Sequence, residues 1–476
     1  MKKVPIIDQL KSSMKNSRFL LNLILMCSIV FTMSCSKSNN SSTNFSNGIK
    51  KVNHVVVIYM ENHSFDNLYG SFSGANGFSG TGYNSKNSQV DVNGNVYTTL
   101  PGIPASQWAN ITNYSTQFPV NMPNDTFNID QYVAANLIIP DVTHRYYQEQ
   151  NQIDGGKMDK YVAYNGSTLL SMGYYKTNEL PLLSLAQNYT LCDMFFHSAF
   201  GGSFLNHMWL IAAASPTFPN APASMVAKVT QQNGQWMITS DGQVTPDGYV
   251  VNTSYSVNHP HPANASPSTL VPNQTMPTIG DELSAANVSW AWYAGGWNNA
   301  LAGNPDPSFQ FHHQPFIYFQ NYADGTPAKT QHLKDETDFM TAAQTGNLPS
   351  VSFVKPLGLY NEHPGYANVI DGEKHAADLI NAVLNGPNGK DAVIVLTYDE
   401  NGGFWDHVAP PTIDAKWGPG TRVPALIISP FAKKNYVDHT QYETVSILSF
   451  IEQRWGLQPL SNRDKNATPL SNAFSF

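Results

Sequence analysis

The sequence predicts an α/β fold, a three-layer αβα sandwich in which helices cover both faces of a mostly parallel sheet. Short apolar runs rich in β-branched residues, such as 54–60 and 392–396, are typical of buried parallel strands. Helical segments alternate with these runs along the chain, as βαβ units require. The 476 residues, 41% of them hydrophobic, are enough to fill the core of one large domain.

The positions of the elements follow from the apolar pattern and from glycine and proline punctuation. Strands are expected at 53–60, 190–195, 288–293, 350–354, 392–397 and 423–428. Helices are expected at 144–151, 179–188, 330–345, 373–385 and 441–455, with a further helix at Ser203. The chain before residue 140 is rich in loops. Residues 215–275 are rich in Pro, Asn, Ser and Gln, which predicts an irregular excursion with a hairpin turning at Asp241-Gly242.

The first 35 residues are similar to a bacterial lipoprotein signal peptide. Basic residues between positions 2 and 18 precede an apolar stretch at 19–33 that is too short for a typical membrane span. Cys35 follows a small residue and would be the lipidated first residue of the mature protein, although Thr32 stands where Leu is usual. Residues 36–50 would be a flexible polar tether and 51–476 the folded domain. A plain secretory signal with a chance cysteine is the alternative.

The charge balance bears on partners and location. The formal net charge is −8, and no basic run is present that could release counterions from a phosphate backbone. We therefore expect no nucleic-acid partner, and no protein partner is predicted. The N-terminal signal predicts a protein of the bacterial cell envelope, lipid-anchored and facing the periplasm or the outer membrane, or secreted.

Acidic and amide side chains directly follow two of the predicted strands. Asp399 and Glu400 come after the strand at 392–397, and Glu61 and Asn62 come after the strand at 53–60. Two adjacent carboxylates at the end of a buried strand repel each other unless a cation lies beside them. Ligands bind at the carboxyl ends of parallel strands in α/β folds. The two segments would form one site if their strands are neighbours.

A third segment supplies a candidate nucleophile, Ser203. Gly201 and Gly202 free the backbone before it, and the residues after it are typical of a helix. Ser203 would then be the N-cap, where free N–H groups and the helix dipole favour anions, although a capping role alone would also explain a serine there. Asn206 lies one turn later on the same face. A hydroxyl beside a metal can lose its proton and attack phosphorus.

With these segments, the chain resembles the bacterial phosphoesterase family of acid phosphatases and phospholipases C, within the alkaline-phosphatase-like superfamily. The similarity extends roughly over residues 51–460, and the matching segments occur in the family's order. They are VVVIYMENHSFDNLYG (55–70), HRYYQEQNQIDGGKMDKYV (144–162), the glycine-serine-asparagine segment (201–206), FHHQPFIYF (311–319), KPLGLYNEHPGY (355–366), TYDENGGFWDHV (397–408) and RVPALIISPFAKKNYVDHTQYETVSILSFIEQRWGL (422–457).

The resemblance implies a metal-dependent phosphoric ester hydrolase that forms a phosphoserine at Ser203. One divalent cation would be bound by Glu61, Asn62, Ser203 and Asp399, with Glu400 beside or behind Asp399. Hard oxygen ligands suit Ca, Mg, Mn or Fe and do not exclude Zn. The phosphoryl oxygens would be contacted by Asn206, His144, His312 or His313, and His363, and His363 is also a candidate general acid. The excursion at 215–275 would pass over the active-site face.

Three functions remain open from the sequence. An acid-phosphatase-like phosphomonoesterase is the main expectation, because Ser203 stands where phospholipid-cleaving relatives often carry Thr and no appended C-terminal β domains follow the family segments. A phosphodiesterase of the phospholipase C type is the alternative. A non-catalytic surface lipoprotein that only binds a ligand is the second alternative, against which the complete set of Ser, Asn, His and carboxylate residues argues.

Overall fold

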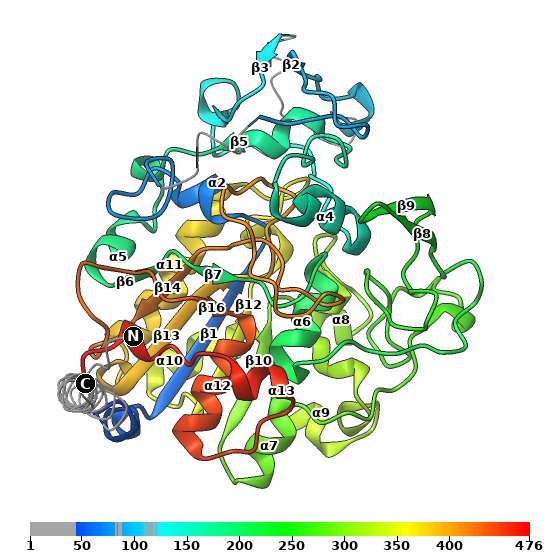
Figure 1. Cartoon of the computed structure of the whole chain (residues 1–476). Helices are drawn as coiled ribbons and strands as arrows, with labels where there is room; N and C mark the ends of the chain where they lie inside the picture. Colours follow the sequence, from blue (N-terminus) through cyan, green and yellow to red (C-terminus); the bar gives the residue numbers. More distant parts are fainter. Residues whose placement is uncertain (1–43, 81–82, 84–87, 109–110, 112–117, 120) are drawn as a thin grey trace, which may run out of the picture. The chain divides into compact units, whose positions relative to one another are not determined.

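The computed structural model describes residues 44–476 except 81–82, 84–87, 109–110, 112–117 and 120 (Figure 1). The chain divides into two units, residues 1–51 with Phe476 and residues 52–475. The predicted signal peptide and Cys35 lie outside the described residues. In the first unit, residues 44–51 are helical and end in the 3₁₀ turn Ile49–Lys51, although an irregular tether was expected at 36–50. No helix of the described residues is both long and apolar enough to cross a bilayer.

An eight-stranded sheet organises the second unit (Figure 1). All neighbouring strands run parallel except β14, which is antiparallel to both of its neighbours. This arrangement confirms the α/β class and the mostly parallel sheet. The strands, in spatial order, are β11 (Leu333–Asp335), β10 (Trp290–Ala294), β12 (Val351–Lys355), β1 (His54–Met60), β13 (Ala392–Tyr398), β14 (Ala425–Ile428), β6 (Thr190–Cys192) and β15 (Tyr436–Asp438).

The two strands with polar ends are neighbours. β1 pairs in parallel with β13, and Met60 is opposite Tyr398 in the register. Every residue of β13, and every residue of β1 after His54, is buried, as apolar runs in a parallel sheet require. The carboxylates that follow these strands therefore meet at one edge of the sheet. β12 pairs with the other side of β1 and adds a third strand end to the same place.

Helices pack around the sheet in groups, α6 with α12 and α10 with α11. The described residues between β1 and residue 140 are mostly loops, as expected, and their regular elements other than one short helix are short strands and 3₁₀ turns. The helices are α2 (Phe65–Tyr69), α4 (Tyr146–Ile153), α5 (Leu183–Asn188), α6 (Ser203–Ala212), α7 (Ile279–Ala285), α8 (Trp297–Leu301), α9 (Pro327–His332), α10 (Glu336–Thr345), α11 (Val369–Asn385), α12 (Thr444–Trp455) and α13 (Asn462–Asn466). The strands outside the large sheet are β2 (Thr99–Leu100), β3 (Met122–Pro123), β4 (Phe127–Asn128), β5 (Gly173–Tyr174), β7 (Phe195–Phe196), β8 (Lys228–Gln232), β9 (Gln235–Ser240) and β16 (Tyr442–Glu443).

Two expectations about local structure are wrong. The single helix expected at 330–345 is divided, because Asp335 caps a new helix, α10, and the residues before it form the edge strand β11. The expected hairpin exists, but it turns at Asn233 and Gly234, whose φ angles of 52° and 80° suit a two-residue turn. Asp241 instead forms an ion pair with Arg145 of the segment before α4.

Candidate active site

The strand ends of β1 and β13 form a buried cluster of oxygen atoms. Glu61, Asn62, Asp399 and Glu400 are all inaccessible to solvent. Asn62 has a φ of 73°, a left-handed conformation that Asn tolerates better than most residues. Gly402, also at positive φ, lies so close to Asn62 that a Cβ would come within 2.2 Å of the Asn62 carbonyl oxygen. Glycine is therefore required at position 402, where the segments that follow the two strands approach each other.

Ser203 lies beside this cluster at the beginning of α6. Its hydroxyl donates to Glu61 Oε2 at 3.1 Å and lies 3.3 Å from the terminal amide of Asn62. Gly202 is the N-cap of α6, and Ser203 is the first residue of the helix. The expectation that Ser203 itself is the cap is therefore wrong. The hydroxyl is consequently free of a capping bond and points to the strand ends. Residues that are distant in sequence, at 61–62, 203 and 399–400, meet at one point.

Asn206 has a different role from the expected contact with phosphoryl oxygens. Its amide nitrogen donates to the carbonyl groups of Ala199 (3.0 Å), Gly201 (3.1 Å) and Gly202 (3.3 Å), and its oxygen accepts from Ala199 N. The side chain is fully buried. Asn206 therefore closes the loop before Ser203 onto α6, and its amide is occupied by backbone groups.

Glu149 of α4 holds the same loop from the other side and was not singled out from the sequence. Its carboxylate accepts from Gly201 N (2.5 Å), from Thr421 N and Oγ1 (both 2.9 Å) and lies 2.8 Å from His197 Nε2. The other ring nitrogen of His197 faces Ala199 O at 2.8 Å. Both ring nitrogens of the buried His197 thus face oxygen atoms, and the ring links Glu149 to the loop at Ala199.

Two further residues at the site were missed from the sequence. Lys355, at the end of β12, is fully buried, and its ammonium lies 2.6 Å from Glu61 Oε1 and 3.7 Å from Asp399 Oδ2. His207, one turn after Ser203, has Nδ1 2.7 Å from Ser203 O and 3.8 Å from Asp399 Oδ2. The signal for Lys355 was available, because it follows an apolar strand run as Glu61 does.

The carboxylates at the strand ends outnumber the cations around them. Burial raises the pKa of Glu61, but Lys355 and His313 outweigh burial and hold that pKa well below its usual value. Burial and the charge of Glu61 raise the pKa of Asp399 well above its usual value, and burial and Asp399 do the same for Glu400. Three carboxylates face one ammonium group. A divalent cation would supply the missing positive charge.

The amide of Asn62 also fits a cation. One of its terminal atoms lies 2.8–3.3 Å from oxygens of Glu61, Ser203, Asp399 and Glu400. If that atom is nitrogen, it donates to these oxygens, and the amide oxygen accepts from His363 Nε2 at 2.8 Å. If it is oxygen, only the Ser203 hydroxyl can donate to it, and a cation is needed beside the three carboxylates. Asp399 Oδ2 makes no hydrogen bond to Asn62 in either orientation and has no donor among the described residues, so a cation would satisfy it in both cases.

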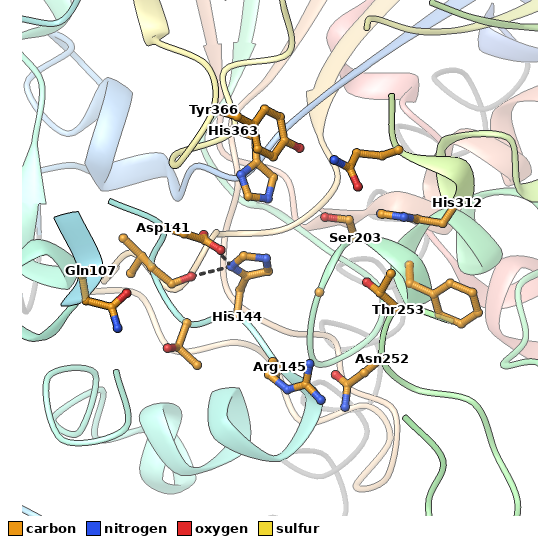
Figure 2. Close-up of a pocket in the computed structure, with 15 residues that line it drawn as sticks. Gln107, Asp141, His144, Arg145, Ser203, Asn252, Thr253, His312, His363 and Tyr366 are labelled. Atoms are coloured by element: carbon orange, nitrogen blue, oxygen red, sulfur yellow. Dashed lines mark hydrogen bonds and ion pairs between the residues drawn. The ribbon is translucent and has the colours of Figure 1, made fainter. Parts of the chain in front are cut away.

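Three of the predicted histidines line a cavity of about 400 Å³ that opens above Ser203: His144, His312 and His363 (Figure 2). His144 Nδ1 lies 2.5 Å from Val142 O, and its Nε2 lies 3.8 Å from Glu400 Oε1. Burial lowers the pKa of His144, and burial together with His313 lowers the pKa of His312 well below its usual value. The rings of His144 and His312 therefore favour the neutral form near pH 7.

The side chains of His312 and His313 point to different parts of the site. His312 lines the cavity, whereas His313 points to the strand ends, with Nε2 2.6 Å from Glu61 Oε1. The ring of His313 stacks on His207 with 5.2 Å between centroids. Burial lowers its pKa to about 4 despite the neighbouring carboxylate of Glu61. His312 is thus the member of the pair that can contact a ligand, and His313 supports Glu61.

Comparisons with known proteins show the family of the chain. The family model described as the Phosphoesterase family matches residues 52–458. Non-hemolytic phospholipase C of Pseudomonas aeruginosa is 25% identical over 469 residues, covering 90% of this chain and 58% of that protein. Phospholipase C B of Mycobacterium tuberculosis is 26% identical over 470 residues, covering 89% of this chain and 78% of that protein. The chain thus spans little more than half the length of the Pseudomonas relative.

Solved structures show more distant similarity. A protein in the alkaline phosphatase superfamily from Vibrio parahaemolyticus aligns with a TM-score of 0.31 and 11% identity, over 60% of this chain and 66% of that one. Murine ectonucleotide pyrophosphatase/phosphodiesterase 5 aligns with a TM-score of 0.33 and 10% identity, over 62% of this chain and 95% of that one. Both sequence relatives are named as hydrolases of phosphoric esters, which is the enzyme class expected from the sequence. The family match includes both polar strand ends, Ser203 and the cavity histidines, and the chain belongs to the Phosphoesterase family.

Proposed function

We propose that this member of a family of phosphoric ester hydrolases is a metal-dependent phosphomonoesterase that works through a phosphoserine at Ser203. One observation carries the proposal. The Ser203 hydroxyl lies between a buried carboxylate cluster, 3.1 Å from Glu61 Oε2, and a cavity lined by His144, His312 and His363. A nucleophile, a site for a cation and polar groups for phosphoryl oxygens are therefore contiguous.

The cation would be held by Glu61, Asn62, Ser203 and Asp399, with Glu400 next to Asp399. When bound, a divalent cation lowers the pKa of a coordinated hydroxyl and neutralises charge that develops on phosphoryl oxygens. Lys355 keeps Glu61 ionised by its contact at 2.6 Å, so that this carboxylate remains an acceptor for the Ser203 hydroxyl. The identity of the cation stays open among Ca, Mg, Mn, Fe and Zn.

In the first step, Ser203 Oγ forms a bond to phosphorus as the bond from phosphorus to the ester oxygen breaks. The hydroxyl hydrogen passes to Glu61 Oε2, which already accepts it. His363 Nδ1 faces Pro364 O at 2.5 Å, which leaves Nε2 to face the leaving oxygen; it would act as the general acid in the form of the ring that carries a proton on both nitrogens. His144 and His312 line the cavity that receives the phosphoryl oxygens. Water then hydrolyses the phosphoserine, releasing phosphate and restoring Ser203.

A phosphodiesterase of the phospholipase C type is the second candidate, because both curated relatives are named phospholipase C. A comparison of p-nitrophenyl phosphate, bis-p-nitrophenyl phosphate and phosphatidylcholine distinguishes the two. We expect the highest kcat/KM for the monoester, since its dianionic group gains most from a cation and several polar donors. A higher value for either diester would establish the second candidate, and no turnover of any of them would indicate a protein that only binds its ligand.

We also propose that the mature protein begins at Cys35 and is held at the membrane by its lipid. Two or more acyl chains anchor a protein stably, whereas one chain alone is marginal. Changing Cys35 to Ser should leave the protein unprocessed or release it into the soluble fraction, as measured by fractionation and by the intact mass. Wild-type protein that is wholly soluble and cleaved elsewhere would contradict the anchor.

A further inference from the structure

The open walls of the cavity above Ser203 are hydrophilic (Figure 2). Six polar residues outside the catalytic set line it and are at least partly exposed to solvent. They come from four separate segments of the chain, and one of these segments contains His144. These residues are Gln107, Asp141, Thr143, Arg145, Thr253 and Gln310.

Little apolar surface is available in the same cavity. Val142 and Phe204 belong to the lining but are 0% exposed, so they support the walls from behind. Tyr366 is the only partly exposed aromatic side chain among the described residues that line the cavity. Its ring stacks on His363, with 4.3 Å between centroids and 19° between planes (Figure 2).

The polar side chains of the walls have hydrogen-bonding capacity to spare. Arg145 is oriented by its ion pair with Asp241 and by Gly242 O at 3.5 Å, and other N–H groups of its guanidinium have no hydrogen-bond partner among the described residues. Within the described part of the chain, neither Gln107 nor Gln310 forms a side-chain hydrogen bond. Both amides can therefore donate to and accept from a ligand.

From these walls, and on the basis of the function proposed above, we infer that the leaving group of the substrate is a polyhydroxylated alcohol such as a sugar. Hydroxyl groups donate and accept, so they match a wall built from amides, a guanidinium, a carboxylate and Thr253. Tyr366, which lines the cavity and is partly exposed, offers the carbon skeleton of a sugar ring an apolar contact. An acylglycerol would cover the same polar groups without replacing their hydrogen bonds to water, which is costly.

Two phosphate monoesters with six-carbon primary alcohols test this inference, glucose 6-phosphate and hexyl phosphate. They share the phosphoryl group and differ in the hydroxyl groups of the leaving alcohol. We expect the wild-type kcat/KM for glucose 6-phosphate to exceed that for hexyl phosphate by about tenfold, the value of one or two net hydrogen bonds. Vesicles of phosphatidylcholine, assayed in parallel, should be hydrolysed more slowly than glucose 6-phosphate.

The variant Gln310→Met keeps the length of the side chain and removes the amide that would form hydrogen bonds with the sugar. It should lower the ratio of the two kcat/KM values by about 2- to 10-fold, through the sugar ester. Gln320→Met, on an exposed position outside the cavity, should leave both values unchanged. If Gln310→Met is unstable in a thermal melt, Thr253→Val makes the same test on the opposite wall.

The outcomes separate this inference from the proposed function. Equal or faster hydrolysis of hexyl phosphate, or a ratio that neither variant changes, would overturn the hydroxylated leaving group while leaving the phosphatase intact. Preference for phosphatidylcholine would overturn both, because it would establish the phospholipase C-type candidate. Failure of the wild-type protein to hydrolyse any of these esters, loaded with each divalent cation in turn, would overturn the proposed function and this inference with it.

Discussion

Glu149 accepts a hydrogen bond from the backbone N–H of Gly201 at 2.5 Å, and this bond fixes the loop that delivers Ser203. Gly201 has a φ of 93°, and a Cβ there would come within 2.7 Å of the Tyr146 backbone, so the loop packs directly on the beginning of α4. Asn206 binds the carbonyl groups of the same loop. The position of the nucleophile thus depends on an amide and a carboxylate that touch no substrate.

Glu149→Gln tests this dependence. The carboxylate faces four donors, two from Thr421 and one each from Gly201 and His197, so a glutamine must point its NH₂ group at a donor. We expect Ser203 to be displaced and kcat to fall by about 10- to 100-fold, because small misplacements of reacting groups have effects of this size. KM should change less, since the cavity walls remain.

Glu179→Gln is the matched control, because Glu179 is exposed and lies outside the site. Both proteins should be compared by steady-state kinetics at temperatures where circular dichroism shows each to be folded. A Glu149→Gln enzyme with normal kcat would show that the loop is held without this bond.

Lys355→Met should lower the stability of the protein more than the same substitution of a surface lysine does. The ammonium is the buried partner of Glu61 and Asp399, and removing one member of a buried ion pair costs about 3–5 kcal/mol. A melting temperature lower by several degrees is expected, together with weaker inhibition by phosphate. Lys390→Met, at an exposed position, serves as control. Unchanged melting and unchanged phosphate binding would mean that Lys355 is not needed for charge balance.

The parts of the site that the sequence predicted are those with a local signal. Apolar runs located the strands, and the polar residues directly after them, Glu61 and Asp399, had to lie at the strand ends. From the sequence, the two segments would form one site if their strands are neighbours, and the sheet shows that β1 and β13 are. A sequence thus indicates where a strand ends, and in which direction it runs, when a charged residue directly follows an apolar run.

The remaining features depend on contacts between distant segments. Glu149 meets Gly201 and Thr421, which are 52 and 272 residues away, and no local pattern indicates either contact. The amide of Asn206 turns back to its own loop, a direction that helical spacing alone does not define. The antiparallel direction of β14 has no signature in an apolar run, and the three residues of β11 are hidden between two helical segments.

Removal of one carboxylate should remove the metal. Asp399→Asn keeps the shape of the side chain and deletes one of three negative charges, so metal affinity should fall by at least about tenfold. The readout is elemental analysis of the purified protein after dialysis, with activity measured in parallel. Asp378→Asn on the exposed face of α11 should retain full occupancy. Active wild-type protein that contains no metal and resists chelators would contradict the site.

A buried pair of glutamates predicts how stability changes with pH. Burial raises the pKa of Glu373 to about 8, and burial together with Glu373 raises the pKa of Glu362 well above its usual value. The folded protein therefore keeps protons that the unfolded chain releases above about pH 4.5. This contribution to stability is complete below that pH and is lost as the pH rises towards 8, at up to about 5 kcal/mol.

Glu373→Gln should make the melting temperature less dependent on pH between 5 and 8, because a glutamine has no proton to lose. The effect should be largest at pH 8, where the variant is expected to be more stable than the wild type. Melting curves at several pH values, compared with those of Glu282→Gln on α7, provide the measurement. If the two variants show the same slope, the pair is not protonated in the folded state.

Ser203→Ala addresses the nucleophile itself. The hydroxyl donates to Glu61 Oε2 at 3.1 Å and borders the histidine-lined cavity, and the variant keeps the helix start, because Gly202 is the N-cap. Loss of the covalent route should lower kcat by roughly 10³-fold or more. Acid-quenched wild-type enzyme should carry one phosphoryl group, found by mass spectrometry on the peptide containing Ser203, and the variant should carry none. Metal content should fall only partly, since Glu61, Asn62 and Asp399 remain. A folded variant with near-normal turnover would assign the attack to water, and a phosphoryl group found on another residue would assign it to that residue.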